Sequence, residues 1–451
     1  MVNPSPGERT DGRTDARAGG RTGARTDVVV VGAGAAGLAC AADLAAAGVD
    51  VRLLEADGAP GGRMRTDQVA GFTVDRGFQV FNTSYPQVKR RLDLRRLRLR
   101  PFSPAVLVST PGGIRRFTDP TRDLRRSGDL LTGRAATPRD LLAAGTLSAR
   151  DMLEPVARLR SRPDTTTHLA LRKAGVSQEL VETFFRPFLS GVFLEEDLAT
   201  SARVFHLVWR AFLRGTLCLP ADGIQAVPAQ LADALPAGVL STGTPVDGLT
   251  GGGVGLADGT RADARAVVVA TGPRAAARLL PGLEVPAVRT VSTVYHAAER
   301  SPLAEPTLVV DARRRFLNTC VLTEVHPRFA GDGRALVSTS VLGELSPERE
   351  VRLREALAEV YGTDTRSWET VHQVTVRDAL PAMPPPHPLT RTTRLGGGRY
   401  VCGDHRTTGS LQGALASGAR AAREVLADLG HGPGRGRRAE RASYGASRPS
   451  A

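Results

Sequence analysis

A strand–turn–helix signature near the N-terminus constrains the fold more than any other feature of this chain. An apolar segment at 27–31 runs into Gly32-Ala33-Gly34-Ala35-Ala36-Gly37 and then into an Ala-rich stretch that ends near residue 47. A second apolar segment at 50–55 ends in Glu55, 23 positions after Gly32. A G-x-G-x-x-G between a strand and a helix, with an acid at this distance, is the pattern of a βαβ dinucleotide-binding unit. The sequence therefore predicts a Rossmann-type start to an α/β protein.

Each position of the signature has a physical role. Gly32 permits the tight turn, Gly34 lets the backbone approach a pyrophosphate, and Gly37 lets the helix pack closely on the sheet. The helix N-terminus offers free N–H donors and a partial positive charge to phosphates. Glu55 accepts from a ribose hydroxyl, and its charge repels a 2′-phosphate. The nucleotide is thus expected to be FAD or NAD rather than NADP.

A second glycine-rich loop follows directly, at Gly61-Gly62-Arg63-Met64. Two glycines let the backbone lie against a ligand, and Arg63 offers a fork of donors to a phosphate. Together with the segments 72–78, 220–228, 244–246 and 268–272, this loop resembles the flavin amine oxidase superfamily, which includes protoporphyrinogen oxidases and phytoene-desaturase-like enzymes. The resemblance implies that the cofactor is FAD.

The C-terminal part of the chain carries a third segment of this resemblance, at 401–404 and 409–418. In the family this segment passes the isoalloxazine ring, and a helix N-terminus there would stabilise an anionic reduced flavin. No cysteine falls where covalent members attach their flavin, so we expect FAD to be bound without a covalent link. The cofactor contacts that the motifs imply are Gly32, Gly34, Ala35, Ala36, Gly37, Glu55, Ala56, Gly61, Gly62, Arg63, Met64, Arg65, Gly77, Phe78, Gln79, Val246, Ala270, Thr271, Gly272, Gly403, Asp404, Gln412, Gly413 and Ala414.

The order of the motifs predicts a discontinuous FAD-binding domain interleaved with a mixed α+β substrate domain. We expect FAD-binding parts at 27–84, 216–285 and 391–429, and substrate-domain parts at 85–215, mainly helical, and at 286–390. The ends at 1–26 and 430–451 are rich in Gly, Arg, Ser and Pro and lack hydrophobic periodicity, so we expect disordered tails. Helices are expected near 224–235, 347–361 and 412–429. Strands are expected at 105–109, 291–297, 307–310, 316–322, 335–341 and 400–402.

Two departures from the amine oxidases narrow the expected chemistry. Those enzymes usually place a cage tyrosine where Ser410 stands, and a lysine that holds a water at flavin N5. The only lysines here, Lys89 and Lys173, lie in the wrong parts of the chain. We therefore expect a dehydrogenation or desaturation that removes hydride and proton from an apolar organic substrate, with hydride passing to flavin N5. An amine oxidase with an atypical cage is the alternative enzyme, and a non-enzymatic binding module, like the GDP-dissociation inhibitors that resemble this superfamily, is the other alternative.

Catalytic residues are less well indicated than cofactor contacts. His405 directly follows Asp404 and is a candidate proton acceptor, while Tyr295 and His296 are weaker candidates within a predicted strand. Each histidine also fits an ordinary structural role. The aromatic-rich stretch 180–214 is either helical core or a wall of an apolar substrate cavity.

The charge distribution and the cysteines limit which partners and which cellular compartment we expect. Residues 89–134 hold thirteen basic and four acidic side chains, a net charge of +9 in one stretch. This stretch forms either solvated faces or a contact with a membrane surface or an acidic group, while nothing accompanies it that is typical of nucleic-acid binding. The four cysteines form no C-x-x-C pair, so their spacing does not predict a metal site, and they fit the role of small buried hydrophobic residues. No apolar segment typical of a signal peptide precedes the first motif. We expect a cytoplasmic protein, with peripheral membrane contact through 89–134 as the alternative to solvated faces, and the oligomeric state is not indicated.

Overall fold

The first of two large sheets is built around the valine-rich strand β1. The computed structural model describes residues 25–123, 125, 128 and 136–431. The strands β10-β2-β1-β13-β20 are all parallel, and β11, β12 and β19 extend this sheet in antiparallel pairs. Their bounds are β1 (Thr26–Val31), β2 (Val51–Leu54), β10 (Leu240–Ser241), β11 (Val246–Thr250), β12 (Gly253–Leu256), β13 (Arg261–Val269), β19 (Arg394–Gly396) and β20 (Arg399–Val401). Both faces of β1 are buried, as its run of valines requires in a parallel sheet.

Alternate residues of β1 face two different apolar clusters. Val28 and Val30 pack with residues of α1 (Ala35–Ala46), α10 (Ala226–Asp233) and α14 (Leu411–Asp428). Val29 and Val31 pack with α11 (Pro273–Leu279) on the other side. The short α2 (Pro86–Arg91) lies beside α14. Helices on both faces of a parallel sheet confirm the predicted α/β class.

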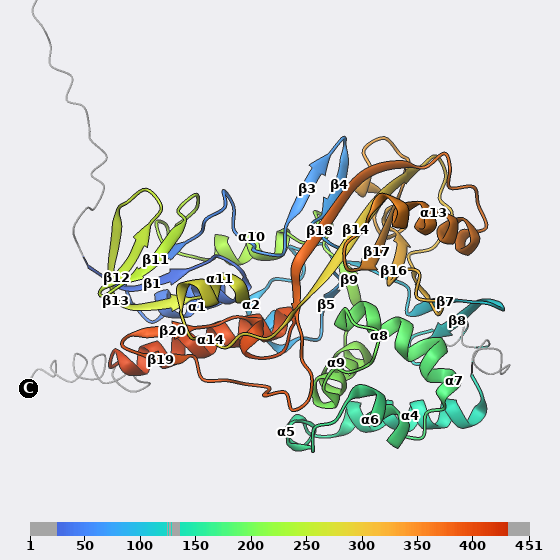
Figure 1. Cartoon of the computed structure of the whole chain (residues 1–451), viewed down its shortest axis with the longest axis horizontal. Helices are drawn as coiled ribbons and strands as arrows, with labels where there is room; N and C mark the ends of the chain where they lie inside the picture. Colours follow the sequence, from blue (N-terminus) through green and yellow to red (C-terminus); the bar gives the residue numbers. More distant parts are fainter. Residues whose placement is uncertain (1–24, 124, 126–127, 129–135, 432–451) are drawn as a thin grey trace, which may run out of the picture.

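The second large sheet is antiparallel except for the pair β15 and β7, in the order β18-β14-β17-β16-β15-β7-β8. Figure 1 shows it on the right, with β14 and β18 running back toward the first sheet. Its strands are β7 (Ala105–Thr110), β8 (Gly113–Thr118), β14 (Val288–Ala298), β15 (Leu308–Asp311), β16 (Asn318–Val321), β17 (Ala335–Leu342) and β18 (Glu369–Pro381). Helix α13 (Pro347–Tyr361) covers one face through Leu353 and Leu357.

A group of helices lies below the second sheet in Figure 1. It contains α4 (Pro138–Leu153), α5 (Val156–Ser161), α6 (Thr167–Lys173), α7 (Gln178–Leu180), the π-helical turn η1 (Val181–Phe185), α8 (Arg186–Phe193) and α9 (Ala202–Arg214). The remaining elements are β3 (Thr66–Val69), β4 (Phe72–Asp75), β5 (Phe81–Asn82), β6 (Arg100–Pro101), β9 (Leu217–Leu219), α12 (Leu322–Val325), η2 (Pro327–Phe329) and η3 (Asp404–Arg406). The segments 85–215 and 286–390 share the second sheet, and the exact domain limits stay a prediction.

The structure corrects two parts of the secondary-structure prediction. The segment expected to be mainly helical also supplies β6 and β8, and the long strand β18 was not foreseen. Strand β8 carries Arg115 and Arg116 and lies at the sheet edge, where only Thr118 is buried, so its sequence lacks apolar alternation. Most of β18 is only half-buried, which weakens the same signal. Helix α13 begins and ends where the sequence predicted it.

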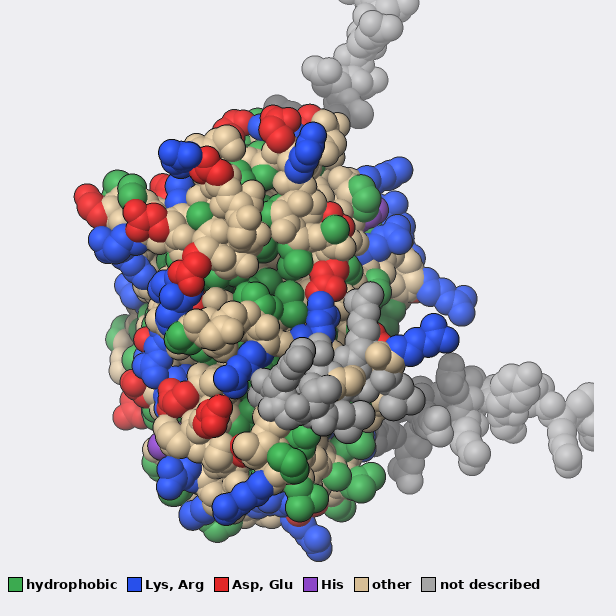
Figure 2. All heavy atoms as spheres, turned by 90° about the vertical axis from the view of Figure 1, so that its right-hand side faces the viewer, with side chains coloured by type: hydrophobic (Ala, Val, Ile, Leu, Met, Phe, Trp, Pro, Cys, Tyr) green, Lys and Arg blue, Asp and Glu red, His purple; other side chains and the backbone are tan. Residues whose placement is uncertain are grey.

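Many arginines of the basic segment are neutralised by carboxylates from elsewhere in the chain. Ion pairs join Arg91 to Asp43, Arg98 to Asp222, Arg115 to Glu179 and Arg116 to Glu305. Figure 2 faces the side that carries β7 and β8, and on it blue and red side chains are interspersed. Arg126, Asp129 and Arg134 lie outside the described residues. Peripheral membrane contact through 89–134 stays a prediction, and among the described helices none is long and apolar enough to span a bilayer.

Candidate functional site

The turn between β1 and α1 forms the floor of a cradle. Gly32 has φ +100°, and a methyl group built on it would lie 3.2 Å from the Ala270 carbonyl oxygen. Gly34 precedes the first turn of α1, and a methyl group there would meet nothing within 4 Å. The turn therefore presents bare backbone and free N–H groups at a helix N-terminus, which is the arrangement that binds a pyrophosphate.

Glu55 follows β2 and lies beside this turn. Its Oε2 accepts from the Ala33 amide at 2.6 Å, and its Oε1 accepts from the Asp57 amide at 3.0 Å. The side chain is buried, yet the carboxylate keeps lone pairs for a further donor such as a ribose hydroxyl. The backbone thus fixes the orientation of the acid that the sequence assigned to the ribose.

The second glycine loop lies directly against the first. The Gly61 amide donates to the Ala33 carbonyl at 2.9 Å, and a methyl group on Gly62 would lie 3.4 Å from Gly34 Cα. Two backbones without side chains therefore face each other across one cradle. The side-chain Nε2 of Gln79 donates to the Arg63 carbonyl at 2.8 Å, which ties the loop to the segment after β4.

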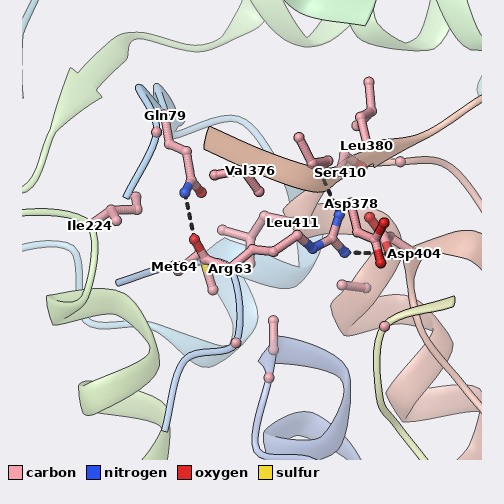
Figure 3. Close-up of a pocket in the computed structure, with 18 of the residues that line it drawn as sticks. Arg63, Met64, Gln79, Ile224, Val376, Asp378, Leu380, Asp404, Ser410 and Leu411 are labelled. Carbon is pink, nitrogen blue, oxygen red and sulfur yellow. Dashed lines mark hydrogen bonds and ion pairs between the residues drawn. The ribbon is translucent and has the colours of Figure 1, made fainter. Parts of the chain in front are cut away.

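Arg63 links the first cofactor motif to the last one. Its guanidinium donates to Oδ1 of Asp404 at 2.6 Å and to the Ala379 carbonyl at 2.7 Å (Figure 3). Asp404 is nearly fully buried, while the Arg63 side chain is one-third exposed. The Asp404 charge raises the pKa of Arg63 against the effect of burial, which by itself lowers it. The pair places one cation and one anion at the edge of the cradle, and the cation retains donors for a phosphate.

Helix α14 brings a second helix N-terminus to the same cavity. Ser410 caps it by accepting from the Gly413 amide at 3.0 Å. Further along, a methyl group on Gly418 would lie only 2.1 Å from the Ala36 carbonyl oxygen. The α1 and α14 backbones therefore touch, and this contact holds the two helix ends close together. Ser410, which was noted as a replacement for a cage tyrosine, is a helix cap in this protein.

A cavity of about 630 Å³ joins these parts. Of the expected cofactor contacts, it is lined by Gly32, Gly34, Ala35, Ala36, Glu55, Ala56, Gly61, Gly62, Arg63, Met64, Gly77, Phe78, Gln79, Val246, Ala270, Thr271, Gly272, Gly403, Asp404 and Ala414. They come from three distant parts of the chain, which the parallel order β2-β1-β13-β20 brings to one sheet edge.

Four expected contacts do not line this cavity. Gly37 lies inside α1, and a methyl group on it would be 1.9 Å from the Gly32 carbonyl oxygen, so it serves packing. Arg65 pairs with Asp57 and donates to the Ala59 carbonyl. The Gln412 side chain accepts from the Gln87 amide. Gly413 has no room for a side chain because a methyl group would be 1.9 Å from the Thr408 carbonyl oxygen.

The three catalytic candidates also lie outside the cavity. His405 is buried against Gly403 with no hydrogen-bond partner, and burial lowers its pKa to about 4. His296 packs beside Trp368 on the α13 side of the sheet, and burial lowers its pKa to about 4. The Tyr295 hydroxyl donates to the Asp75 carbonyl at 2.6 Å. None of the three therefore contacts the cavity in the part of the chain that the structure describes, and a catalytic role for them stays a prediction.

Beyond the cradle the cavity continues between the second sheet and helices α8 and α9. We call this part the apolar chamber; its residues are Phe188, Gly191, Val192, Phe193, Leu194, Val208, Phe212, Val291, Leu308, Val310, Leu317, Asn318, Ser340 and Val376. The sequence left the stretch 180–214 as either helical core or a cavity wall, and part of it lines the chamber; the contribution of the second sheet was not foreseen. Alternation in those strands marks buried residues, and it does not tell which face meets a cavity.

The residues of the cradle fit a bound dinucleotide. Two helix N-termini, a buried carboxylate and two glycine backbones surround one elongated space, and an arginine stands at its edge. Positive helix ends suit the pyrophosphate and a reduced flavin, and the carboxylate suits a ribose. The fold and this cradle define a dinucleotide-binding protein whose cavity extends from the cradle into the apolar chamber.

Comparison with known proteins gives the family. The model of the flavin containing amine oxidoreductases matches residues 35–426, and the chain belongs to this family. It is therefore an FAD-dependent oxidoreductase. The fold resembles a protoporphyrinogen oxidase-like protein of Exiguobacterium sp. 255-15, with 18% identity, TM-score 0.65 and coverage of 89% of this chain and 99% of the other. It also resembles cyclohexylamine oxidase from Brevibacterium oxydans, with 18% identity, TM-score 0.64 and coverage of 90% and 100%.

Sequence similarity to characterised enzymes is strong only over a short segment. The hydroxyneurosporene desaturase of Cereibacter sphaeroides is 49% identical over 72 residues, which are 15% of this chain and 14% of the relative. The zeta-carotene-forming phytoene desaturase of Myxococcus xanthus is 46% identical over 72 residues, with the same shares. The matched segment thus spans about a seventh of these relatives.

Proposed function

We propose that this enzyme dehydrogenates a largely apolar organic substrate that lies in the apolar chamber. The observation that carries the proposal is the lining of the chamber. Of its fourteen described residues, only Asn318 and Ser340 have polar side chains, and none is charged. Burial of apolar surface, at about 25 cal/mol per Å², is then the main source of substrate affinity. The local similarity to two carotenoid desaturases supports the same class of substrate.

Two further observations favour a neutral substrate over an amine. Phe188 and Phe212 are the aromatic pair in direct contact within the chamber lining, with centroids 5.5 Å apart and an edge-to-face angle of 68°. Rings that touch in this way leave no space for an amine between them. Lys89 and Lys173 both lie on exposed parts of helices, so neither holds a water in the chamber.

The protein's own contribution is then binding, orientation and exclusion of water. FAD supplies the acceptor for the hydride when it is bound. The α8–α9 side chains and the second sheet hold the substrate from two sides and limit the water that reaches the reacting carbon. Since no acid, histidine or lysine stands among the described chamber residues, we propose that the released proton passes to solvent.

Anaerobic mixing of the purified enzyme with candidate substrates tests this proposal. An acyclic polyene should bleach the flavin band near about 450 nm, and a simple primary amine should not. The variant Val208→Asp places a charge in the chamber and should abolish bleaching by the polyene. Val351→Asp is a matched control because Val351 is 59% exposed on α13. Rapid bleaching by the amine would refute the proposal in favour of an amine oxidase, and a porphyrinogen that bleaches where polyenes do not would change the substrate class.

A further inference from the structure

One polar row crosses the sheet wall of the apolar chamber. Thr293 on β14 lies directly opposite Ser340 on β17, and Ser340 lies directly opposite Asn318 on β16. Residues opposite each other in antiparallel strands point to the same face, with Cβ atoms about 4.5–5.5 Å apart. Ser340 and Asn318 line the cavity, so the row faces the chamber and not α13.

Thr293 and Ser340, at one end of the row, are hydrogen-bonded, whereas the Asn318 side-chain oxygen at the other end has no partner. The Phe78 amide donates to Thr293 Oγ1 at 3.3 Å, and the Thr293 and Ser340 hydroxyls are 2.9 Å apart. Asn318 is only 7% exposed, yet its Oδ1 has no hydrogen-bond partner. A buried polar atom without a partner is destabilising, which points to a partner for this oxygen from outside the chain.

The residues around Asn318 indicate which kind of chemical group can bind to its side-chain amide. A methyl group on Gly191 of α8 would lie 3.1 Å from Nδ2 of Asn318, so a glycine leaves room for this amide between sheet and helix. Of the acidic residues of the cavity lining, Glu55 and Asp404 belong to the cradle, and Asp378 of β18 lies beside Asp404 and pairs with Arg274 (Figure 3). A cationic group would therefore meet no countercharge beside Asn318.

A hydroxyl group satisfies the amide in either orientation. A carboxamide offers one acceptor and one donor end, and a hydroxyl can donate to the first and accept from the second. An ether or a plain hydrocarbon leaves the acceptor end without a partner. The Asn318 amide therefore fits a hydroxyl group on an otherwise apolar molecule.

We propose that Asn318 binds a hydroxyl group of the substrate and selects hydroxylated apolar molecules over their non-hydroxylated counterparts. This inference rests on the proposed function in that the chamber is the substrate site, and it adds the polar group that the substrate carries. Asn318 is a specificity residue that sets which end of an elongated substrate enters the chamber. Ser340 and Thr293 lie next to it in the row and face the same chamber.

Calorimetric titration of the FAD-loaded enzyme with two isomers, 1-octanol and heptyl methyl ether, tests the inference. Both have the same atoms, and only the alcohol can donate. We expect the alcohol to bind about tenfold more tightly, the factor that corresponds to roughly 1.4 kcal/mol. Asn318→Leu should remove this preference by weakening the alcohol and leaving the ether unchanged.

Thr319→Val is the matched control, since Thr319 lies on the same strand but faces Thr339 and Tyr361 on the other side of the sheet. It should keep the preference. Equal affinities in the unmodified enzyme, no binding of 1-octanol, or a preference that survives in Asn318→Leu would each overturn the inference. If Asn318→Leu lost its flavin or its fold, Asn318→Ala would replace it, and the comparison in the unmodified enzyme stands without any variant. Binding is measured without turnover, so a failure of dehydrogenation would leave this result intact.

Discussion

Replacing Gly418 by Ala should weaken both the fold and the cofactor site through one contact. The added methyl group would lie 2.1 Å from the Ala36 carbonyl oxygen, whereas non-bonded atoms approach to about 3.5 Å. Helix α14 would have to move by roughly 1.4 Å from α1, or the methyl group would be strained in place. Over-packing of this kind costs about 1–3 kcal/mol of unfolding free energy, more than the ~1 kcal/mol that Ala gains over Gly in a helix.

The same shift moves two helix N-termini that line the cradle, so FAD affinity should fall by about tenfold. Urea denaturation of the apoprotein measures the first effect, and fluorescence titration with FAD measures the second. Gly145→Ala is the matched control because Gly145 lies within α4, is exposed, and has open space where the methyl group would be. It should raise stability by up to ~1 kcal/mol and leave FAD affinity unchanged. A Gly418→Ala protein as stable as the parent would refute the close helix contact.

Three further predictions follow from the cofactor site and the buried histidines. Acid precipitation should release the yellow colour into the supernatant, because all four cysteines are buried thiols; colour in the pellet would contradict non-covalent binding. Arg63→Ala should lower FAD affinity by about ten- to a hundredfold, because a charge-assisted hydrogen bond contributes roughly 1.5–3 kcal/mol. An unchanged dissociation constant for FAD would show that Arg63 does not contact the phosphates. Burial lowers the pKa of His405 to about 4, so the unfolded chain binds the extra proton between pH 4 and 6.5. The free energy of unfolding should therefore fall by up to ~3 kcal/mol as the pH drops through this window, and it should fall less in His405→Gln; denaturation at a series of pH values measures both. If the two proteins showed identical pH profiles, the His405 ring would not be buried in its neutral form.

The sequence by itself determined the cofactor half of the protein. The turn at Gly32 and Gly34, the acid Glu55 and the loop around Gly62 are local patterns whose spacing follows from the geometry of one βαβ unit. Such patterns can be read from the chain because the residues that act together are neighbours along it or at a fixed distance. Most of the expected contacts accordingly line one cavity.

Tertiary structure alone decided which side chains form the apolar chamber. Thr293, Ser340 and Asn318 are separated by at least 22 positions, and only the pairing of β14, β17 and β16 places them in one row. The same applies to His405, whose position after Asp404 indicated a catalytic group, while the path of the chain after β20 buries its ring against Gly403. Which face of a strand meets a cavity depends on register and on the helix packed opposite, and neither is encoded in the alternation of a single strand.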